Sequence, residues 1–348
     1  MLVAKANTSG KQSRAMKRYG NLYEKIISIE NLRRADEKAR RGKSGNYGVQ
    51  KHDKNRDENI LQLHAMLKRE EFQCSEYRVF TIYEPKEREI YQLPYYPDRI
   101  VHHAIMNILE PIWCNIFIRD TFACIKGRGI HDAMNQMKRM LKDAEGTKYC
   151  LKIDVRKYYP SISHDILKAI VRRKIKCYKT LKLLDCIIDS APGVPIGNYL
   201  SQYFANLYLA YFDHWIKEEL KIKHYLRYAD DMVFMARDKA TLHGLLIQVN
   251  HYFVENLNIS IKSNYQIFPL ESRGVDFVGF VFRHSHTRMR KSIKQNFARM
   301  IKKIDNDKLT NKEYKQQLCG WLGWAKYSQS KHFLKQNIKQ EHFESILK

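Results

Sequence analysis

The sequence of 348 residues predicts an α+β fold in which an antiparallel sheet is flanked by helices. Three observations predict this class. Apolar residues recur every three or four positions near both ends of the chain, as on one face of an amphipathic helix. From Lys148 to Val155 apolar and less apolar residues alternate, which is the period of a strand. In Tyr225–Ala236, two short apolar or aromatic runs flank Ala229, Asp230 and Asp231, which predicts a hairpin.

The remaining elements follow from the same two periods. Before the strand at Lys148, we expect helices at Tyr23–Arg41, Ile60–Arg69 and Arg99–Trp113, a strand at Tyr77–Tyr83, and a further helix ending near Leu141. After Gly197 a helix is indicated by Leu200, Phe204, Leu207, Tyr211 and Trp215 at core spacing. A strand is expected at Ile259–Ser263. The last predicted helix carries an apolar stripe formed by Met289, Ile293, Phe297, Ile301 and Ile304.

Composition excludes several classes of protein. Lys and Arg number 62 against 37 Asp and Glu, and the formal net charge of +25 indicates a polyanionic partner. Hydrophobic residues make up 44% of the chain and aromatic residues 12%, enough for packed cores, which argues against wholesale disorder. No apolar run is long enough for a membrane span and residues 1–20 lack a signal-peptide core, so we expect a cytoplasmic protein. The 7 cysteines are scattered without a CxxC pair, which argues against a zinc site.

The positive charge is concentrated at the two ends. Met1–Glu58 has 15 basic and 7 acidic residues, and His284–Lys348 has 15 and 5. The residues between them carry 32 basic and 25 acidic side chains, an ordinary balance for an enzyme. A solvated tail is the usual reading of a basic end, but both ends also have apolar residues at helical spacing. We therefore expect the C-terminal helix to pack on one side and to bind nucleic-acid phosphates through Arg290, Lys291, Lys294, Lys302 and Lys303.

Three carboxylates carry the chemical prediction. Asp154 ends its strand on the less apolar face, and Asp230 and Asp231 lie at the tip of the hairpin. A surface residue and an ordinary turn are the alternatives for these positions. Adjacent carboxylates flanked by apolar strands repel each other, and a divalent cation that prefers oxygen ligands relieves this repulsion. On adjacent strands of one sheet the three could hold two metal ions about 4 Å apart, the arrangement of a phosphoryl-transfer site.

Other catalytic patterns are missing from the sequence. It contains no Walker A loop, no GxGxxG and no HExxH, so a P-loop nucleotidase and a zinc protease lack their usual motifs. The adjacent His102 and His103 would face different directions on a helix and do not suggest a metal pair. The carboxylates are therefore the candidates for catalysis.

Five segments resemble the motifs of reverse transcriptases. Tyr228–Asp231 (YADD) resembles the YxDD box, and Asp154–Ile162 (DVRKYYPSI) resembles the first palm motif. Gly193–Gln202 (GVPIGNYLSQ) resembles the second motif, Gly274–Phe280 (GVDFVGF) the primer-grip hairpin, and Pro85–Arg88 the basic fingers strand. The segments stand in the family's order, which makes the set far more specific than any one motif. The resemblance implies an RNA-directed DNA polymerase with the right-hand fold of fingers, palm and a small helical thumb.

Two residues of the second motif differ from most reverse transcriptases and point to one group within the family. Ile196 stands where most reverse transcriptases have Gln in the second motif, and Gln202 stands where they have Pro. This pattern resembles the reverse transcriptases of diversity-generating retroelements, as do the segments CIKGRGIH (124–131) and GWLGWAKYS (320–328). The resemblance then covers nearly the whole chain. It implies cDNA synthesis on a template-repeat RNA with errors opposite adenines, and replacement of the amide by Ile196 would weaken the hold on the base pair.

The resemblance also implies a role for individual residues. Asp154, Asp230 and Asp231 become the metal-binding catalytic triad, with the carbonyl of Val155 as a further ligand. Tyr159 falls where the family selects deoxynucleotides by blocking a ribose 2′-hydroxyl, although core packing would also explain an aromatic residue there. Other positions implied to contact the nucleotide are Lys86, Arg88, Ile196, Gly197 and Gln202. Lys262 is a candidate general acid for pyrophosphate, with a surface lysine as the alternative.

The implied domains divide the chain into four parts. Residues 1–70 form a basic helical extension, 71–147 the fingers, 148–283 the palm, with 160–200 partly returning to the fingers, and 284–348 a basic helical thumb. The 65 residues after Arg283 are too few for a ribonuclease H domain of the usual size, so we expect polymerisation without cutting. The implied cofactor is Mg²⁺, two ions, with Mn²⁺ as a substitute. The implied partners are an RNA template, the RNA–DNA duplex, dNTPs and a small basic accessory variability protein.

Alternative functions remain open at this point. Another bacterial reverse transcriptase, of the defence-associated or retron type, would share the same motifs. An RNA-dependent RNA polymerase is disfavoured because Tyr159 predicts rejection of ribonucleotides. A non-catalytic nucleic-acid-binding protein with a polymerase fold is disfavoured because Asp154, Asp230 and Asp231 are all present.

Overall fold

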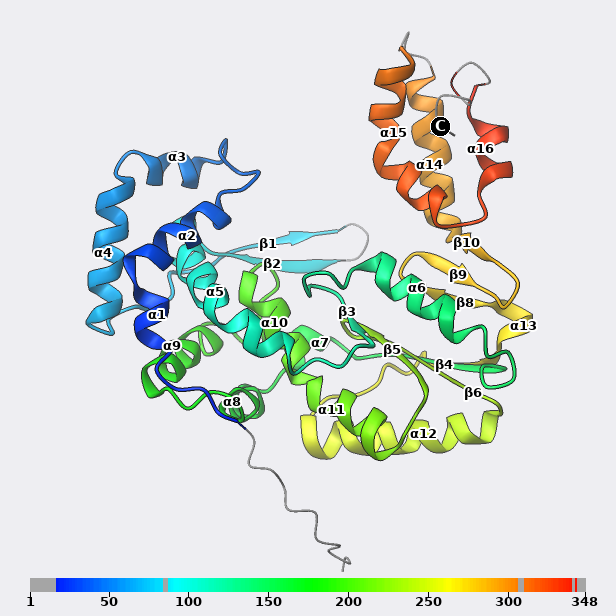
Figure 1. Ribbon diagram of the computed structural model, residues 1–348, viewed down its shortest axis with the longest axis horizontal. Helices are drawn as coiled ribbons and strands as arrows, with labels where there is room; N and C mark the ends of the chain where they lie inside the picture. The colour runs from blue at the N-terminus through cyan, green and yellow to red at the C-terminus, as the bar shows by residue number, and fades with distance from the viewer. Residues whose placement is uncertain (1–16, 84–86, 306–309, 340–341, 343–348) are drawn as a thin grey trace, which may run out of the picture. The chain divides into compact units, whose positions relative to one another are not determined.

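The computed structural model describes residues 17–83, 87–305, 310–339 and 342. The chain folds as two compact units. The first unit comprises Met1–Ile116 and Tyr159–Tyr208, and the second comprises Phe117–Tyr158 and Leu209–Lys348. Figure 1 labels their elements along the chain. None of the described helices is long and apolar enough to cross a membrane.

The first unit is mainly helical. Its central helix α5 (Ile100–Cys114) is buried along most of its length and packs against α1 (Tyr23–Ile27), α2 (Ile29–Ala39) and α10 (Tyr199–Tyr208). The sequence predicted one helix over Tyr23–Arg41, but the structure breaks it at Ser28. The Ser28 hydroxyl accepts a hydrogen bond from the Asn31 N–H and caps α2, which explains the break.

The other elements of the first unit surround this core. The expected strand at Tyr77–Tyr83 is present as β1, which pairs with β2 in an antiparallel hairpin. The second segment of the unit contributes three more helices and part of a fourth. Their bounds, with those of the remaining elements, are α3 (Tyr47–Asp53), α4 (Arg56–Lys68), β1 (Arg78–Ile82), β2 (Arg88–Gln92), η1 (Tyr95–Arg99), α7 (Tyr158–Ser161), α8 (His164–Arg172) and α9 (Tyr178–Ile188).

The second unit is built on a five-stranded sheet with the order β3-β5-β6-β4-β7. All neighbours are antiparallel except the short β3, which runs parallel to β5. The strand and the hairpin expected from the sequence are therefore confirmed, as β4 and as β5 with β6. The bounds are β3 (Thr121–Phe122), β4 (Tyr149–Asp154), β5 (His224–Tyr228), β6 (Asp231–Ala236) and β7 (Gln266–Pro269).

Helices cover both faces of this sheet. Helix α6 (Ile130–Met140) lies on one side and α12 (Lys239–Tyr252) on the other (Figure 1). The face toward α12 carries aromatic side chains, and Phe212 packs against Tyr225 and Phe253 there. The helix predicted to extend to Trp215 is interrupted after Tyr208 and continues as α11 (Ala210–His214). A π-helical turn, η2 (Trp215–Glu219), follows α11, and a second one, η3 (Phe253–Leu257), follows α12.

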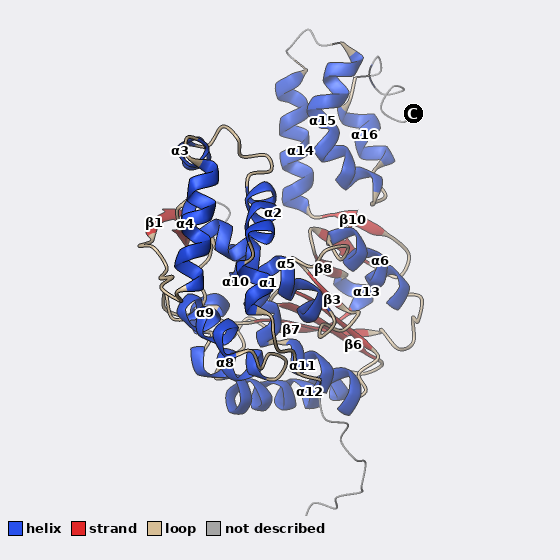
Figure 2. Cartoon of the chain, turned by 60° about the vertical axis from the view of Figure 1, so that its left-hand side comes forward, coloured by secondary structure: helices blue, strands red, loops and turns tan. Residues whose placement is uncertain are grey.

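A small sheet and three helices complete the second unit. Strands β8 (Val275–Phe277), β9 (Phe280–Phe282) and β10 (Thr287–Met289) form an antiparallel sheet in the order β10-β9-β8. Helices α14 (Lys291–Ile304), α15 (Asn311–Lys326) and α16 (Lys331–Asn337) pack together through Phe297, Trp321 and Phe333, and Figure 2 shows them side by side. One cluster of buried apolar residues joins these helices, the small sheet and α6. The sequence placed Met289 on the last helical stripe, but this residue belongs to β10. The remaining short helix is α13 (Leu270–Arg273).

Candidate active site

The three predicted carboxylates come together at one end of the large sheet. Strands β4 and β6 pair in a register that places Asp154 opposite Asp231, and Asp230 lies next to it in the turn before β6. Because side chains alternate along a strand, Asp154, Lys152 and Asp231 share the face of the sheet that also carries α6. The expectation that Asp154 and the Asp pair lie on adjacent strands of one sheet is therefore confirmed.

A strained turn presents Asp230. Tyr228 pairs with Asp231, so Ala229 and Asp230 form a two-residue connection between β5 and β6. Ala229 has φ +54°, a left-handed conformation that costs a residue with a side chain about 1 kcal/mol. The Arg227 guanidinium donates a hydrogen bond of 2.8 Å to the Ala229 carbonyl and holds the turn in this conformation.

A buried ion pair supports that turn from within the unit. Arg227 and Asp213 have fully buried side chains and form hydrogen bonds of 2.5 to 3.1 Å with each other. Tyr225 and Thr121 donate their hydroxyls to the same carboxylate, at 2.6 and 2.8 Å. The apolar patterns of the sequence do not indicate this network. Only the occurrence of Arg in a strand of otherwise buried residues could have indicated it.

Two carboxylates of the site have raised pKa values. Burial raises the pKa of Asp230 to about 7, and the neighbouring Asp154 carboxylate adds to this rise. Burial also raises the pKa of Asp231, although the ammonium group of Lys152 opposes the shift. Both carboxylates therefore bind a proton, or any other cation, more readily than a carboxylate in water does.

Two lysines lie against these carboxylates. Lys262 forms an ion pair with Asp154, and the Lys152 Nζ lies 3.2 Å from Asp231 Oδ2. Lys152 also donates to the main-chain carbonyl of Asp276 in β8. The Asp276 side chain in turn binds Arg290 at the start of α14, with Nε 2.7 Å from Oδ1. Like Arg227 and Asp213, Lys152 was not among the site residues predicted from the sequence.

The backbone around Lys262 differs from the prediction. The segment Ile259–Ser263 was expected to be a strand, but it makes only an isolated bridge between Ile261 and Val155. Two hydrogen bonds flank this bridge, from the Lys262 N–H to the Asp154 carbonyl (2.9 Å) and from the Arg156 N–H to the Ser260 carbonyl (2.9 Å). Neither bond uses the carbonyl of Val155.

The donor set suits a hard divalent cation. Among the described residues, no three His, Cys, Asp or Glu side chains are already arranged as a metal site. Within the same described part of the chain, however, Asp231 Oδ1 is buried and has no hydrogen-bond partner. Mg²⁺ typically binds one or two carboxylates and completes its shell with water and substrate phosphates. An unpartnered carboxylate oxygen beside two further carboxylates fits such an ion.

The second predicted motif is held by its backbone in the first unit. Gly197 has φ +125°, and a Cβ there would lie 2.5 Å from the Tyr91 carbonyl oxygen of β2. A Cβ on Gly193 would lie 2.6 Å from the Tyr159 carbonyl oxygen, which accepts a hydrogen bond from the Val194 N–H. Both glycines are therefore required by close approaches of main chain.

The residues predicted to contact a nucleotide are distributed along this unit. Ile196 has a half-buried side chain, and its carbonyl accepts a hydrogen bond of 2.7 Å from the Tyr91 N–H. Tyr159 is half-buried in α7, Gln202 is exposed on α10, and Arg88 is exposed at the start of β2. Lys86 lies outside the described residues.

The basic helix α14 has exposed lysines and a buried apolar side, as predicted. Lys291, Lys294, Lys302 and Lys303 are exposed on α14, whereas Phe297, Ile301 and Ile304 are buried. Arg290 is half-buried and paired with Asp276.

Comparison with known proteins identifies the family. The family model described as "Reverse transcriptase (RNA-dependent DNA polymerase)" matches residues 85–282, more than half of the chain. The chain belongs to this family. The reverse transcriptase segment begins in the first unit and ends with β9 in the second, and it contains all three carboxylates.

Curated relatives of this reverse transcriptase are distant. Protein YkfC of Escherichia coli is 23% identical over 264 residues, which cover 63% of this chain and 68% of YkfC. The group II intron-encoded protein LtrA of Lactococcus lactis is 25% identical over 142 residues, covering 38% of this chain and 23% of LtrA.

A solved structure supports the fold. Telomerase of Candida albicans, determined with a fragment of telomeric RNA, is similar with a TM-score of 0.50 at 11% identity. The similarity covers 80% of this chain and 57% of the telomerase chain, so this chain spans less than two thirds of that protein, as it does of LtrA. The predicted right-hand polymerase fold, mixed α and β with a sheet flanked by helices, is confirmed.

Proposed function

We propose that this reverse transcriptase copies an RNA template into DNA at the carboxylates of β4 and β6. The observation that carries the proposal is the register of Asp154 opposite Asp231, with Asp230 in the adjoining turn. The raised pKa of Asp230 and the unpartnered Oδ1 of Asp231 among the described residues add support, since both indicate a cation as the natural counterpart.

Each carboxylate has a role in this proposal. Asp154, Asp230 and Asp231 would hold two Mg²⁺ ions, with Mn²⁺ as a substitute and the Val155 carbonyl as a further ligand. The ions held by these carboxylates would activate the primer 3′-hydroxyl and neutralise the charge on departing pyrophosphate. Lys262, which forms an ion pair with Asp154, would give a proton to pyrophosphate.

Substrate binding is assigned to the remaining predicted residues. Tyr159 would exclude ribonucleotides, and Lys86 and Arg88 would bind the triphosphate, for which the guanidinium of Arg88 offers paired donors. Ile196, Gly197 and Gln202 would border the nucleotide, with Gly197 allowing the close backbone approach already described. The exposed lysines of α14 would hold the RNA–DNA duplex, as expected for phosphate contacts on a thumb.

A primer-extension assay tests this activity. The protein is given an RNA template, a DNA primer, Mg²⁺ and either dNTPs or rNTPs. We expect extension with dNTPs only, its loss in Asp230→Asn, and retained RNA binding by that variant. Asp57→Asn is the matched control, because the Asp57 side chain is 81% exposed and lies in the first unit on α4. Extension by Asp230→Asn at the wild-type rate would refute the assignment, and extension with rNTPs would indicate an RNA polymerase.

We further propose the diversity-generating retroelement type, with adenine-directed errors and a small basic accessory protein. Ile196 supports this, because an aliphatic side chain offers no hydrogen bond to the nucleotide or its template. The test is the error spectrum of cDNA made by the wild type and by Ile196→Gln on one RNA. An unchanged error rate opposite adenine in the variant would contradict the role of Ile196.

The alternative is a reverse transcriptase of another bacterial lineage, such as a retron or defence-associated enzyme. The similarity to the intron-encoded LtrA favours this wider group. Gene neighbourhood separates the two: the retroelement type requires nearby imperfect repeats that differ at adenines and a gene for a small basic protein.

A further inference from the structure

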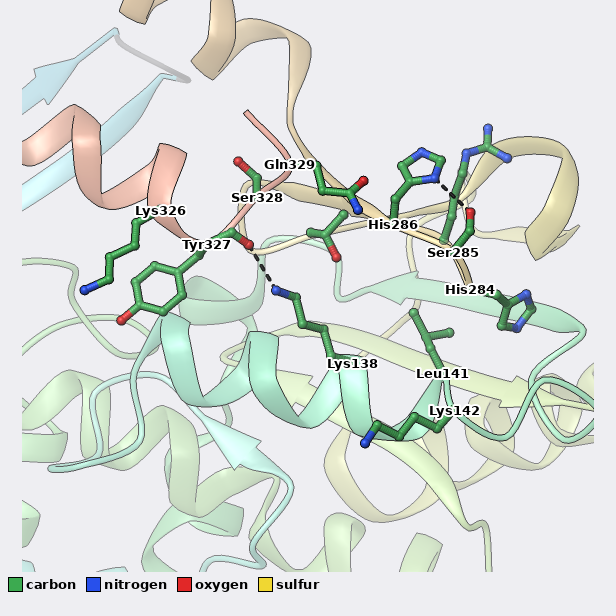
Figure 3. A pocket seen from close by; sticks show the side chains of 12 residues that line it. Lys138, Leu141, Lys142, His284, Ser285, His286, Lys326, Tyr327, Ser328 and Gln329 are labelled. Atoms are coloured by element: carbon green, nitrogen blue, oxygen red, sulfur yellow. Dashed lines mark hydrogen bonds between the residues drawn. The ribbon is translucent and has the colours of Figure 1, made fainter. Parts of the chain in front are cut away.

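A basic pocket lies in the second unit, away from the carboxylates. It has a volume of about 410 Å³ and is formed by the end of α6, the connection between β9 and β10, and the end of α15. Figure 3 shows Lys138, from α6, pointing to the main chain at Tyr327. Lys142, from the turn after α6, and Lys326, from the end of α15, also line the pocket. The Lys138 ammonium group donates a hydrogen bond of 3.0 Å to the Tyr327 carbonyl, which fixes one wall to the other.

The lining of this pocket has a one-sided charge. Lys138, Lys142, Arg283 and Lys326 contribute four cationic groups, and none of the described residues that line the pocket is acidic. Lys142 and Lys326 are exposed, so their ammonium groups are available to a ligand. A concave surface with a single sign of charge concentrates oppositely charged ligands.

Uncharged polar groups also line the pocket. Ser285, Ser328 and Gln329 line it. His286 Nδ1 lies 2.9 Å from the Ser285 hydroxyl, whereas its Nε2 is buried and has no hydrogen-bond partner within the described residues. A buried polar nitrogen normally has a hydrogen-bond partner from the protein or from water. The pocket therefore offers hydrogen-bonding groups as well as charge.

The pocket is separate from the proposed catalytic site. His284, which lines it, lies with Nε2 2.9 Å from the hydroxyl of Thr147, just before β4 begins. Asp154 ends the same strand, and a strand advances about 3.3 Å per residue, so the carboxylates lie roughly 17 Å away. A nucleotide bound at the carboxylates cannot reach the pocket with its own phosphates.

We propose that this pocket binds a single-stranded RNA segment outside the copied region, with its phosphates on Lys142 and Lys326 and an unstacked base or ribose in the hollow. The proposal rests on the proposed RNA-templated function, since it assigns a second contact to the same RNA. Single strands can turn a base out of the stack and place it in a pocket lined with polar groups, whereas a regular duplex cannot. The duplex phosphates instead suit the exposed, convex lysine surface of α14.

The experiment compares two charge-matched variants of the full chain. Lys142→Gln/Lys326→Gln changes the pocket, and Lys302→Gln/Lys303→Gln changes α14 by the same net charge. The probes are a 20-nucleotide unstructured RNA and a blunt 12-base-pair RNA–DNA duplex, each with a fluorescent label. Anisotropy titrations over a range of salt concentrations give the affinity and its salt dependence for each probe.

The two probes should respond differently. Loss of two phosphate contacts should weaken single-stranded RNA binding by the pocket variant roughly tenfold at 0.15 M salt and reduce its salt slope by about 1.4. Its duplex affinity should change less than that of the α14 variant. Unchanged affinity for single-stranded RNA would overturn the proposal and leave an acidic protein as the ligand to test. An equal loss for both probes would also overturn it, since the pocket would then hold duplex backbone.

Primer extension by the wild-type protein separates this proposal from the function on which it depends. If the wild type fails to extend a primer on any RNA, the proposed polymerase activity fails. The binding comparison still decides whether the pocket holds RNA.

Discussion

The ion pair between Arg227 and Asp213 gives the sharpest test of how the carboxylate turn is held. We consider Arg227→Met, Asp213→Asn and the double variant. Each single change leaves one charge in a place where both side chains are fully buried. The double variant leaves no charge. Tyr225 and Thr121 donate to different oxygens of Asp213, so the single amide oxygen introduced at position 213 keeps one of these two hydrogen bonds.

The expected magnitudes follow from this burial. An unpaired buried charge costs about 4 kcal/mol, so each single variant should lose about this much stability. The double variant loses the hydrogen bonds of Arg227, including the one to the Ala229 carbonyl, and should cost about 2 kcal/mol. The interaction energy from the cycle is therefore about 6 kcal/mol.

Urea unfolding of the four proteins, followed by circular dichroism at pH 7.5, measures these values. The double variant should be more stable than either single variant. If the loss of stability in the double variant equals the sum of the two single losses, the two charges do not stabilise each other in the folded protein. That result would refute the assignment of a buried, mutually neutralising pair. Primer extension on the same proteins then shows whether loss of the bond to Ala229 alone lowers activity while the fold is retained.

Three further predictions concern the same sites. The carboxyl of Asp230 has a pKa of about 7 when folded against 3.8 when unfolded, so without metal the stability falls as the pH rises through this interval. Without metal, Asp230→Asn should therefore unfold at a higher urea concentration than the wild type, and the difference should be larger at pH 8 than at pH 5. An unchanged urea midpoint at pH 8 would contradict a destabilising charge on Asp230. Gly197→Ala should lower the melting temperature, because its Cβ would meet the Tyr91 carbonyl, whereas Gly244→Ala in the middle of α12 has open space and should raise it slightly. Lys152→Met removes an ammonium group that lowers the pKa of Asp231, so this pKa should rise and the acid limb of the pH–activity profile should move to higher pH. Lys148→Met, which breaks a surface ion pair with Glu145, is the control. Identical profiles for the Lys152 variant and the wild type would exclude the effect.

The sequence predicted the elements whose pattern is strong and local. Alternation from Lys148 to Val155 identified β4, and the apolar runs around the Asp pair identified β5 and β6. The prediction of secondary structure was wrong where a single contact decides whether a helix or strand continues. The hydroxyl of Ser28 divides one periodic stretch into two helices, and the segment at Ile259–Ser263 has the composition of a strand but forms only one bridge.

The candidate site was predictable in its carboxylates but not in its supporting residues. Asp154 and Asp231 were found because strand period and the hairpin tip bring them to one end of a sheet. Arg227, Asp213 and Lys152 act through contacts with partners that local sequence patterns do not encode. Their roles depend on which strands become neighbours, and a single sequence contains no direct record of that choice.

The way in which the second motif is anchored has a consequence for the accuracy of copying. Its position depends on main-chain contacts made by the Ile196 carbonyl and on the absence of side chains at Gly193 and Gly197. The hydrogen bond made at position 196 uses the main-chain carbonyl, which any residue there would provide. Under the proposed role of Ile196 in accuracy, a substitution at this one position would change the copying error rate while the main-chain contacts that hold the motif stay in place.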